Sequence, residues 1–384
     1  MPKLPLSFLK RAAFALLLVS VACVDPYLKT FTSNTDIFIV DAVLTNSTSG
    51  NYVYLLESST GDGSVSTFLP VSGADVRVLI NDTETVSLNE VKSGYFLFPD
   101  GFKGETGNSY KLQFTAKGQE FESKTQVLPE ENKIQNVYHE FFPEGLKDIE
   151  GKVSPSQRIY VDFQDPADSK DYYMWDWTLY EEQFWCKTCT DGYYYRDAST
   201  PPLGECREIR FRRGKYDYNC DSRCWDIIKN EKVNILKDDF SNGQLVQGRL
   251  AAEIPIYQLI GSLIEIRQLK INKSTYDYLN LVQSQGQNTG GLADTPPASL
   301  AGNVSSTSDI NQPVAGFFIV GSVDTKMYWL DKTDVPAGTS FIGLLGDGRR
   351  PNPEPASMDT TRPPMAPCTD SPERTKTKPL GWIN

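Results

Sequence analysis

The fold class follows from one run of sequence, Tyr172-Tyr173-Met174-Trp175-Asp176-Trp177-Thr178-Leu179-Tyr180. Aromatic residues are favoured in β-strands, whose successive side chains point to opposite faces. Tyr173, Trp175 and Trp177 therefore share one face, and the residues between them share the other. The run predicts a strand that buries one face within a mainly β protein.

Runs of the same kind lie on both sides of this strand, and we predict a larger β-rich domain over residues 130–345. Ser274 is predicted to cap one helix, over residues 274–285, with Tyr278, Leu281 and Val282 on one face. The strands of this domain are predicted at residues 134–142, 158–163, 172–180, 208–212, 233–236, 247–256, 263–271 and 314–323.

The N-terminal part shows the same pattern with shorter spacing. Val76, Val78 and Ile80 alternate with their neighbours, and residues 116–119 have the composition of a hairpin turn. We predict an immunoglobulin-like or transthyretin-like sandwich over residues 36–129. Its strands are predicted at residues 37–44, 52–57, 76–80, 94–98, 110–114 and 120–127.

Cysteines are concentrated in an insert of the second domain, residues 184–226. In an exported protein an even number of cysteines indicates disulfides, here up to three. Zinc is the alternative, because Cys186 and Cys189 have ligand spacing. If all six pair, Cys368 must bond into the insert and would pin the Pro-rich C-terminal tail, residues 346–384. The six are Cys186, Cys189, Cys206, Cys220, Cys224 and Cys368.

The chain begins with the pattern of an export signal. A basic head precedes the apolar run 12–19, and small residues precede Cys23. We predict a signal peptide over residues 1–22, lipid attachment to Cys23 and a tether over residues 23–35. Removal of the signal changes the formal net charge from −11 to −14, and such an acidic protein does not suit nucleic acid.

Aromatic side chains are the most suggestive binding feature. Large rigid rings dominate many interfaces at low entropic cost, so they are candidates for contact with a sugar, a peptide or a partner protein. The alternative is that they fill the core beneath a disulfide-bonded loop. The candidates are Trp175, Trp177, Trp185, Tyr193, Tyr194, Tyr195 and Trp225.

No catalytic residue is predicted. His139 is the single histidine, lies in a strand-like run and is expected to be structural or on the surface. No Asp/Glu pair is singled out for glycoside hydrolysis. Calcium is a weaker alternative, because Asp162, Asp165, Asp168 and Asp171 recur every three residues and Asp238-Asp239 precede a turn. A turn between two strands explains the first group more simply, so no cofactor is predicted.

Several segments together resemble an uncharacterised lipoprotein family of Bacteroidetes-type bacteria. They are Cys23-Val24-Asp25-Pro26-Tyr27, residues 39–45, Asp165-Pro166-Ala167 running into Asp171-Tyr172-Tyr173, residues 291–298, and the ending from Cys368 to Trp382. Such lipoproteins are typically encoded beside SusC-type TonB-dependent outer-membrane transporters. The resemblance implies an outer-membrane, cell-surface setting.

We therefore predict a non-enzymatic accessory subunit, anchored by lipid. The resemblance implies that it captures substrate for a SusC-type TonB-dependent transporter or caps it. A structural or adhesion subunit of a surface assembly is the alternative. A surface hydrolase is a third class, which would need a carboxylate pair in a cleft.

Overall fold

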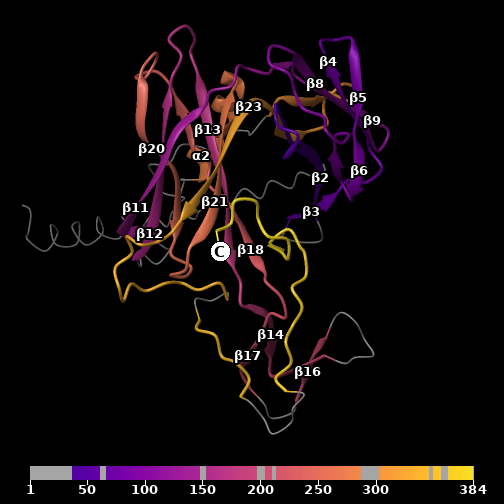
Figure 1. The fold of residues 1–384 in the computed structure, drawn as a ribbon. Coiled ribbons are helices and arrows are strands. Elements are labelled where there is room, and N and C mark those ends of the chain that lie inside the picture. The colour runs from indigo at the N-terminus through magenta and orange to yellow at the C-terminus, as the bar shows by residue number, and fades with distance from the viewer. Residues whose placement is uncertain are drawn as a thin grey trace, which may run out of the picture. The chain divides into compact units, whose positions relative to one another are not determined.

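One 11-stranded sheet runs through the computed structural model (Figure 1), which describes residues 37–60, 66–147, 153–196, 204–209, 213–286, 302–345, 349–355 and 362–383. The predicted signal peptide, Cys23 and the predicted tether lie outside the described residues. The main path of the sheet is β24 (Arg374–Thr375), β18 (Trp225–Lys229), β13 (Tyr172–Glu182), β21 (Ser262–Ile271), β23 (Val314–Leu330), β1 (Phe38–Thr45), β2 (Tyr52–Thr60), β7 (Tyr95–Leu97) and β6 (Asn89–Lys92). β19 (Ile235–Lys237) joins β13, and β3 (Ser66–Pro70) joins β2.

A second sheet packs against β1, β2 and β7 and completes a β-sandwich, which we call the N-terminal sandwich. Val76, Val78, Leu112 and Phe114 are buried at alternate positions, as predicted. The hairpin turn is confirmed, since Lys117 and Gly118 both have positive φ between β8 and β9. This sheet contains β22 (Val304–Ser306), β9 (Gln119–Ser123), β8 (Ser109–Ala116), β4 (Asp75–Ile80), β5 (Glu84–Ser87) and β10 (Gln126–Val127).

β23 links the sandwich to the rest of the chain. Its first half pairs in parallel with β1, and its second half pairs with β21. Gly316 makes the parallel pairing close, because its φ is +95° and a Cβ there would lie 1.9 Å from the carbonyl oxygen of Val40. Phe318 and Val320 belong to the sandwich core, so the N-terminal sandwich needs a strand from far along the sequence.

A three-stranded sheet of β11 (Ile134–Lys147), β12 (Val153–Gln164) and β20 (Leu245–Pro255) covers the second part of the long sheet. Tyr173 and Trp175 are fully buried between the two sheets, and Trp177 packs at the margin of the same core. The aromatic run of residues 172–180 therefore lies in β13, and its predicted face is buried. The mainly β fold class is confirmed, while the exact domain boundaries stay predictions.

The predicted helix is α2 (Lys273–Gly286), but its cap is wrong. Ser274 is the second helical residue, and its hydroxyl bonds Gln126. The face toward the long sheet carries Leu279 and the fully buried Thr275, whereas Leu281 and Val282 are half-buried. The cap prediction fails because Ser274 contacts a strand of the sandwich, which local sequence does not indicate.

The insert consists of short hairpins. Strand 208–212 is predicted too far along the chain: the strand ends at Glu208, Ile209 lies outside it, and residues 210–212 lie outside the described residues. The insert contains β14 (Trp185–Thr190), β15 (Gly192–Tyr195), β16 (Glu205–Glu208) and β17 (Lys215–Asn219). In Figure 1 the yellow tail passes beside it, and single bridges join Pro353 to Asp217 and Ala366 to Cys220.

Candidate binding groove

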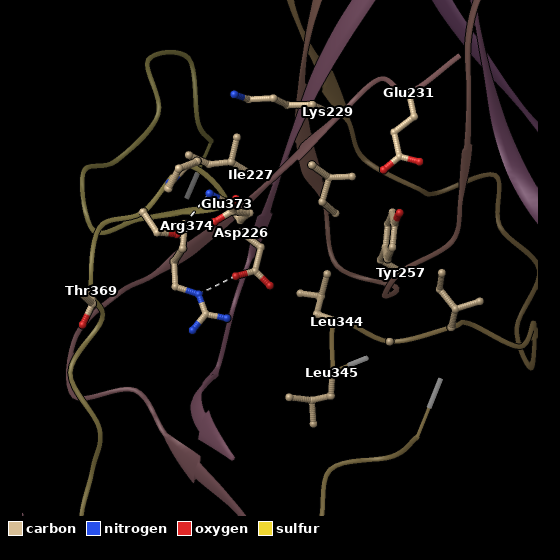
Figure 2. A pocket seen from close by; sticks show the side chains of 15 residues that line it. Asp226, Ile227, Lys229, Glu231, Tyr257, Leu344, Leu345, Thr369, Glu373 and Arg374 are labelled. Carbon is tan, nitrogen blue, oxygen red and sulfur yellow. Dashed lines mark hydrogen bonds and ion pairs between the residues drawn. The ribbon is translucent and has the colours of Figure 1, made fainter. Parts of the chain in front are cut away.

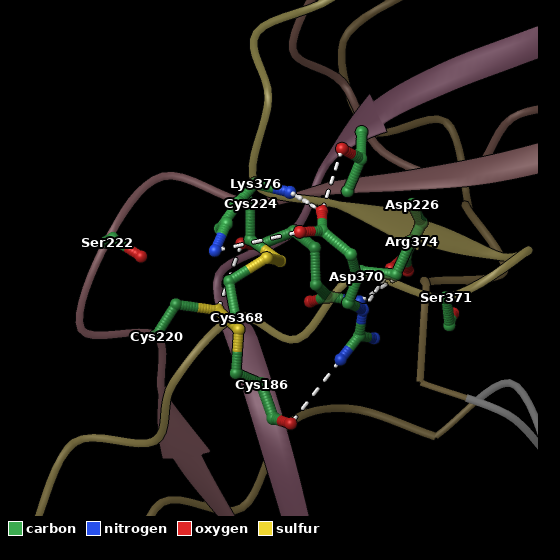
Figure 3. The surroundings of a disulfide bond; sticks show 12 residues. Cys186, Cys220, Ser222, Cys224, Asp226, Cys368, Asp370, Ser371, Arg374 and Lys376 are labelled. Carbon is green, nitrogen blue, oxygen red and sulfur yellow. Dashed lines mark hydrogen bonds and ion pairs between the residues drawn. A yellow bond between two sulfur atoms is a disulfide. The ribbon is translucent and has the colours of Figure 1, made fainter. Parts of the chain in front are cut away.

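All six predicted cysteines form disulfides, and the zinc alternative therefore loses its thiolate ligands. Cys186 pairs with Cys220, Cys189 with Cys206, and Cys224 with Cys368. Figure 3 shows the first and third of these bridges side by side. The bond between Cys224 and Cys368 pins the tail to the end of β18, as the sequence predicts for fully paired cysteines.

The aromatic candidates divide between core and surface. Trp175, Tyr194 and Trp225 are buried and have no surface to offer a ligand. Trp177, Trp185, Tyr193 and Tyr195 are half-buried. The prediction of ligand or partner contact therefore rests on this second group.

Tyr193 and Tyr195 contact the tail. The guanidinium of Arg362 lies 4.5 Å from the ring centre of Tyr193 and 4.4 Å from that of Tyr195. Arg362 also forms an ion pair with Glu354, and Tyr218 donates to the same carboxylate at 2.5 Å. These two tyrosines hold the tail on the insert, which leaves Trp177 and Trp185 as the candidates near hollows of the surface.

A groove of about 760 Å³ lies between β18, residues 342–345 and the pinned tail. We call it the tail groove. Figure 2 shows Tyr257, Leu344 and Leu345 on one side and Arg374 and Glu373 on the other. Its apolar lining is Ile227, Ile228, Tyr257, Ile342, Leu344, Leu345 and Pro372.

The charged side of the tail groove is paired. Arg374 Nε donates to Asp226 Oδ1 at 2.8 Å, and Gln183 Nε2 donates to Asp226 Oδ2 at 2.7 Å. Burial raises the pKa of the Tyr257 phenol, and the nearby Glu181 and Glu231 raise it further, so the ring stays neutral. The groove thus combines an apolar wall with a rigid ion pair, which suits binding of an extended amphipathic group.

The far wall of the tail groove is built by the tail itself. Ile227 N donates to the Glu373 carbonyl at 2.7 Å, and β24 pairs with β18. Residues 342 and 343 are held by donation of their amides to the carbonyls of Ile256 and Tyr257. Both walls therefore depend on segments that are far from β18 in sequence.

A second hollow, of about 490 Å³, shares Tyr257 and residues 342–345 with the tail groove. Three large apolar side chains around it are half exposed: Phe184 at 50%, Leu259 at 46% and Phe341 at 48%. Trp185 also lines it. Exposed apolar side chains that gather at one place are typical of contact surfaces.

His139 lies away from both hollows. Its Nδ1 is 2.8 Å from the hydroxyl of Tyr328, and its Nε2 is 3.6 Å from Asp334 Oδ1. These contacts fit the predicted structural role. We assign it no part in the groove.

The two aspartate groups considered for calcium meet in space. Carboxylate oxygens of Asp165, Asp171 and Asp238 lie within 4.8 Å of one another, and all three residues are buried. Tyr173 donates to Asp165 at 2.5 Å, and Lys270 pairs with Asp171 at 2.8 Å. Burial raises the pKa of the Asp165 carboxyl. An ammonium and a hydroxyl already serve this cluster, and calcium remains the weaker alternative to the predicted absence of a cofactor.

Sequence reasoning missed most of the groove. The run 342–345 is short and apolar, and residues 369–374 belong to a Pro-rich tail with no binding signature. The one available signal is Cys368, which indicates that the tail returns to the insert. Trp177 and Trp185 are the predicted residues that the structure places at hollows.

Fold and site together define a disulfide-bonded, mainly β protein with a groove between β18, residues 342–345 and the tail. A family model described as a domain of unknown function (DUF4249) matches residues 24–327, and the chain belongs to this family. No curated protein and no solved structure matches the chain significantly. Within the described residues, no helix has the length and apolar character needed to span a membrane.

Proposed function

We propose that this protein is a lipid-anchored, non-catalytic binding subunit that serves a SusC-type TonB-dependent transporter at the outer-membrane surface. The proposal of a binding function rests on the tail groove, whose apolar wall faces the ion pair of Arg374 and Asp226. Asp226 accepts hydrogen bonds on both oxygens, which favours a fixed contact surface over a group that exchanges protons.

The compartment rests on two supports. The pattern around Cys23 favours lipid attachment, and three disulfides suit an oxidising compartment. The transporter as partner rests on the resemblance of residues 23–27, 39–45 and 291–298 to lipoproteins encoded beside such transporters.

A structural or adhesion subunit of a surface assembly is the second candidate. It is favoured by the half-exposed Phe184, Leu259 and Phe341 around one hollow, because such a surface suits a permanent protein contact. The two candidates differ in the partner that should be recovered with the protein.

The test is purification of the tagged full-length protein from its native membrane in mild detergent, with identification of what accompanies it. We expect a stoichiometric large β-barrel. Cys23→Ala should weaken the recovery, since it removes the lipid anchor. Leu344→Arg should abolish it, because Leu344 lines the groove.

Leu380→Arg is the matched control, because Leu380 is 88% exposed and lies outside the groove. It should leave the complex intact. Recovery of other surface proteins without a barrel would favour the assembly subunit. Recovery of the protein alone would contradict both candidates.

A further inference from the structure

Arg249 on β20 differs from the other arginines of the described chain. Its guanidinium lies 4.7 Å from the ring centre of the buried Trp175, and burial lowers the pKa of the side chain. Taking a cation out of water is costly unless it is paired with an anion. An anion is therefore expected beside the guanidinium of Arg249.

No such anion is found within the described residues. Arg158, Arg267 and Arg374, which are also partly buried, pair with Glu253, Asp176 and Asp226. Two other arginines among the described residues, Arg213 and Arg350, also have no ion pair, but both are exposed. Among the described residues, Arg249 is thus the half-buried arginine that has no carboxylate partner.

The guanidinium is nevertheless held in a fixed position. Nη2 donates to Asn234 Oδ1 and to the Ile235 carbonyl, the latter at 3.1 Å. Asn234 is itself oriented, because its amide nitrogen donates to the carbonyls of Leu250 and Ala251 at 3.0 and 2.9 Å. Nε is buried without a partner, and Nη1 makes no hydrogen bond within the described residues. The side chain is pre-positioned with part of its binding capacity unused.

Arg249 lines a hollow of about 420 Å³, which lies next to the tail groove and shares Ile228, Lys229, Glu231 and Tyr257 with it. The volume suits a small ligand. Trp177, one of the aromatic candidates, is in the same lining. The apolar lining is Leu146, Trp177, Ile228, Val233, Leu250, Ala251, Ala252, Pro255 and Tyr257.

The charges around this hollow indicate which ligand fits. Lys229 and Lys232 are exposed at its margin with Glu231, while Glu253 is neutralised by Arg158. The lining is therefore positive in a chain whose formal net charge is −11. Glu231 disfavours a multiply charged anion, whereas a single negative charge matches Arg249, the guanidinium of this lining that has no carboxylate partner.

We propose that this hollow binds a small ligand that carries one carboxylate on a flat apolar body. Arg249 would hold the carboxylate by a charge-assisted hydrogen bond, which is roughly twice as strong as a hydrogen bond between neutral groups. Trp177 and Tyr257 would contact the apolar body. The site does not depend on the transporter partnership, so the two proposals can fail separately.

The test uses the full-length protein in mild detergent, with sodium benzoate as the probe and benzamide as its neutral counterpart. Binding is followed by calorimetry and by the rise in melting temperature at constant ionic strength. We expect saturable binding of benzoate and none of benzamide. Arg249→Met should weaken benzoate binding about tenfold or more, as loss of one charged contact implies.

Arg77→Met is the matched control, since Arg77 is an exposed arginine of the sandwich, and it should leave binding unchanged. Trp177→Leu should also weaken binding and serves as the second variant if Arg249→Met does not fold. The proposal is overturned if benzoate shows no saturable binding, if both variants bind it as the unchanged protein does, or if inorganic phosphate binds more tightly than benzoate.

Discussion

The N-terminal sandwich and the insert with its tail are held together by different forces. In the sandwich, Phe121 stacks on Phe114 with 4.6 Å between ring centres and lies 4.7 Å from Phe38. These rings belong to one continuous buried cluster that also includes Phe96 and Phe318. Apolar burial is the dominant favourable term for such a unit.

The insert has a much smaller core, formed by Cys189, Tyr194, Tyr218 and Ala366. Units with so little apolar burial usually need additional links. Here the links are two disulfides within the insert, a third to the tail, the ion pair Arg349–Asp217, and the hydrogen bond from Tyr218 to Glu354, which also pairs with Arg362.

This difference between the two regions indicates which of them responds to redox conditions and to acidity. Apolar burial depends little on redox conditions or acidity, whereas disulfides depend on redox conditions and ion pairs on acidity. The tail groove is built from the second kind of structure. We therefore expect a change of redox state or pH to disturb the groove before it disturbs the sandwich.

The largest expected effect comes from removing the bond between Cys224 and Cys368, which are 144 residues apart in sequence. A bridge across so long a loop contributes about 4–5 kcal/mol in the chain-entropy description. In Cys224→Ser/Cys368→Ser we expect amide exchange to accelerate in β24 and β18, the wall of the tail groove, and to stay unchanged in β4 and β8. Native-state hydrogen exchange measures both.

Cys189→Ser/Cys206→Ser is the matched control, because this bridge spans 17 residues and lies within the insert. It should loosen the hairpins of the insert and leave β24 protected. Equal acceleration in the sandwich and the tail would show that the two regions are not held independently.

The reverse experiment is Phe121→Ala in the sandwich. Phe121 is 2% exposed, and its truncation should cost about 3–4 kcal/mol through lost burial and a cavity. Urea unfolding should show this loss equally with and without a reducing agent, because none of the three disulfides found among the described residues lies in this core. Phe68→Ala, at a side chain 58% exposed, should change stability by less than about 0.5 kcal/mol.

A loss at Phe121 that grows under reducing conditions would contradict the separation of the two regions. It would mean that the insert supports the sandwich through β23 and the long sheet. The sandwich core does include Val304 and Phe318, so this coupling has a structural route.

The parts of the fold that the sequence predicts are those in which local pattern decides the structure. The alternation of Val76, Val78 and Ile80 predicts their burial, and the hairpin at Lys117-Gly118 follows from turn chemistry. The parallel pairing of β1 with β23 could not be predicted, because the paired residues are about 280 positions apart in the sequence. Strand partners of that kind are set by tertiary packing.

The binding sites show the same limit more strongly. The aromatic residues are evident in the sequence, but burial alone separates Trp175, which is in the core, from Trp177, which lines a hollow. Arg249 has no distinguishing sequence pattern. It stands out in the structure because each of the other half-buried arginines among the described residues has a carboxylate partner.

The smallest expected effect is a pH response of the tail at Asp217. Burial by itself would raise the pKa of this carboxyl, but the hydrogen bonds from Arg349 and from the amide of Asn352 outweigh it and hold the pKa below its usual value of 3.8. A carboxyl whose pKa is lower in the folded state stabilises that state above its unfolded pKa. This contribution is lost as the pH falls through the folded value, so the loss begins near pH 4 and grows below it.

Hydrogen exchange at Asp217 and Asn352 between pH 5 and pH 3, corrected for intrinsic rates, should show a loss of about 1 kcal/mol, since one group can contribute no more than about 1.4 kcal/mol for each pH unit. Asp217→Asn should weaken the tail contact at every pH and flatten this dependence. Asp75→Asn, at an exposed carboxylate of the sandwich, should leave it intact. An unchanged pH profile in Asp217→Asn would assign the acid response to another group, and the tail would then owe its hold on the insert mainly to Cys224–Cys368.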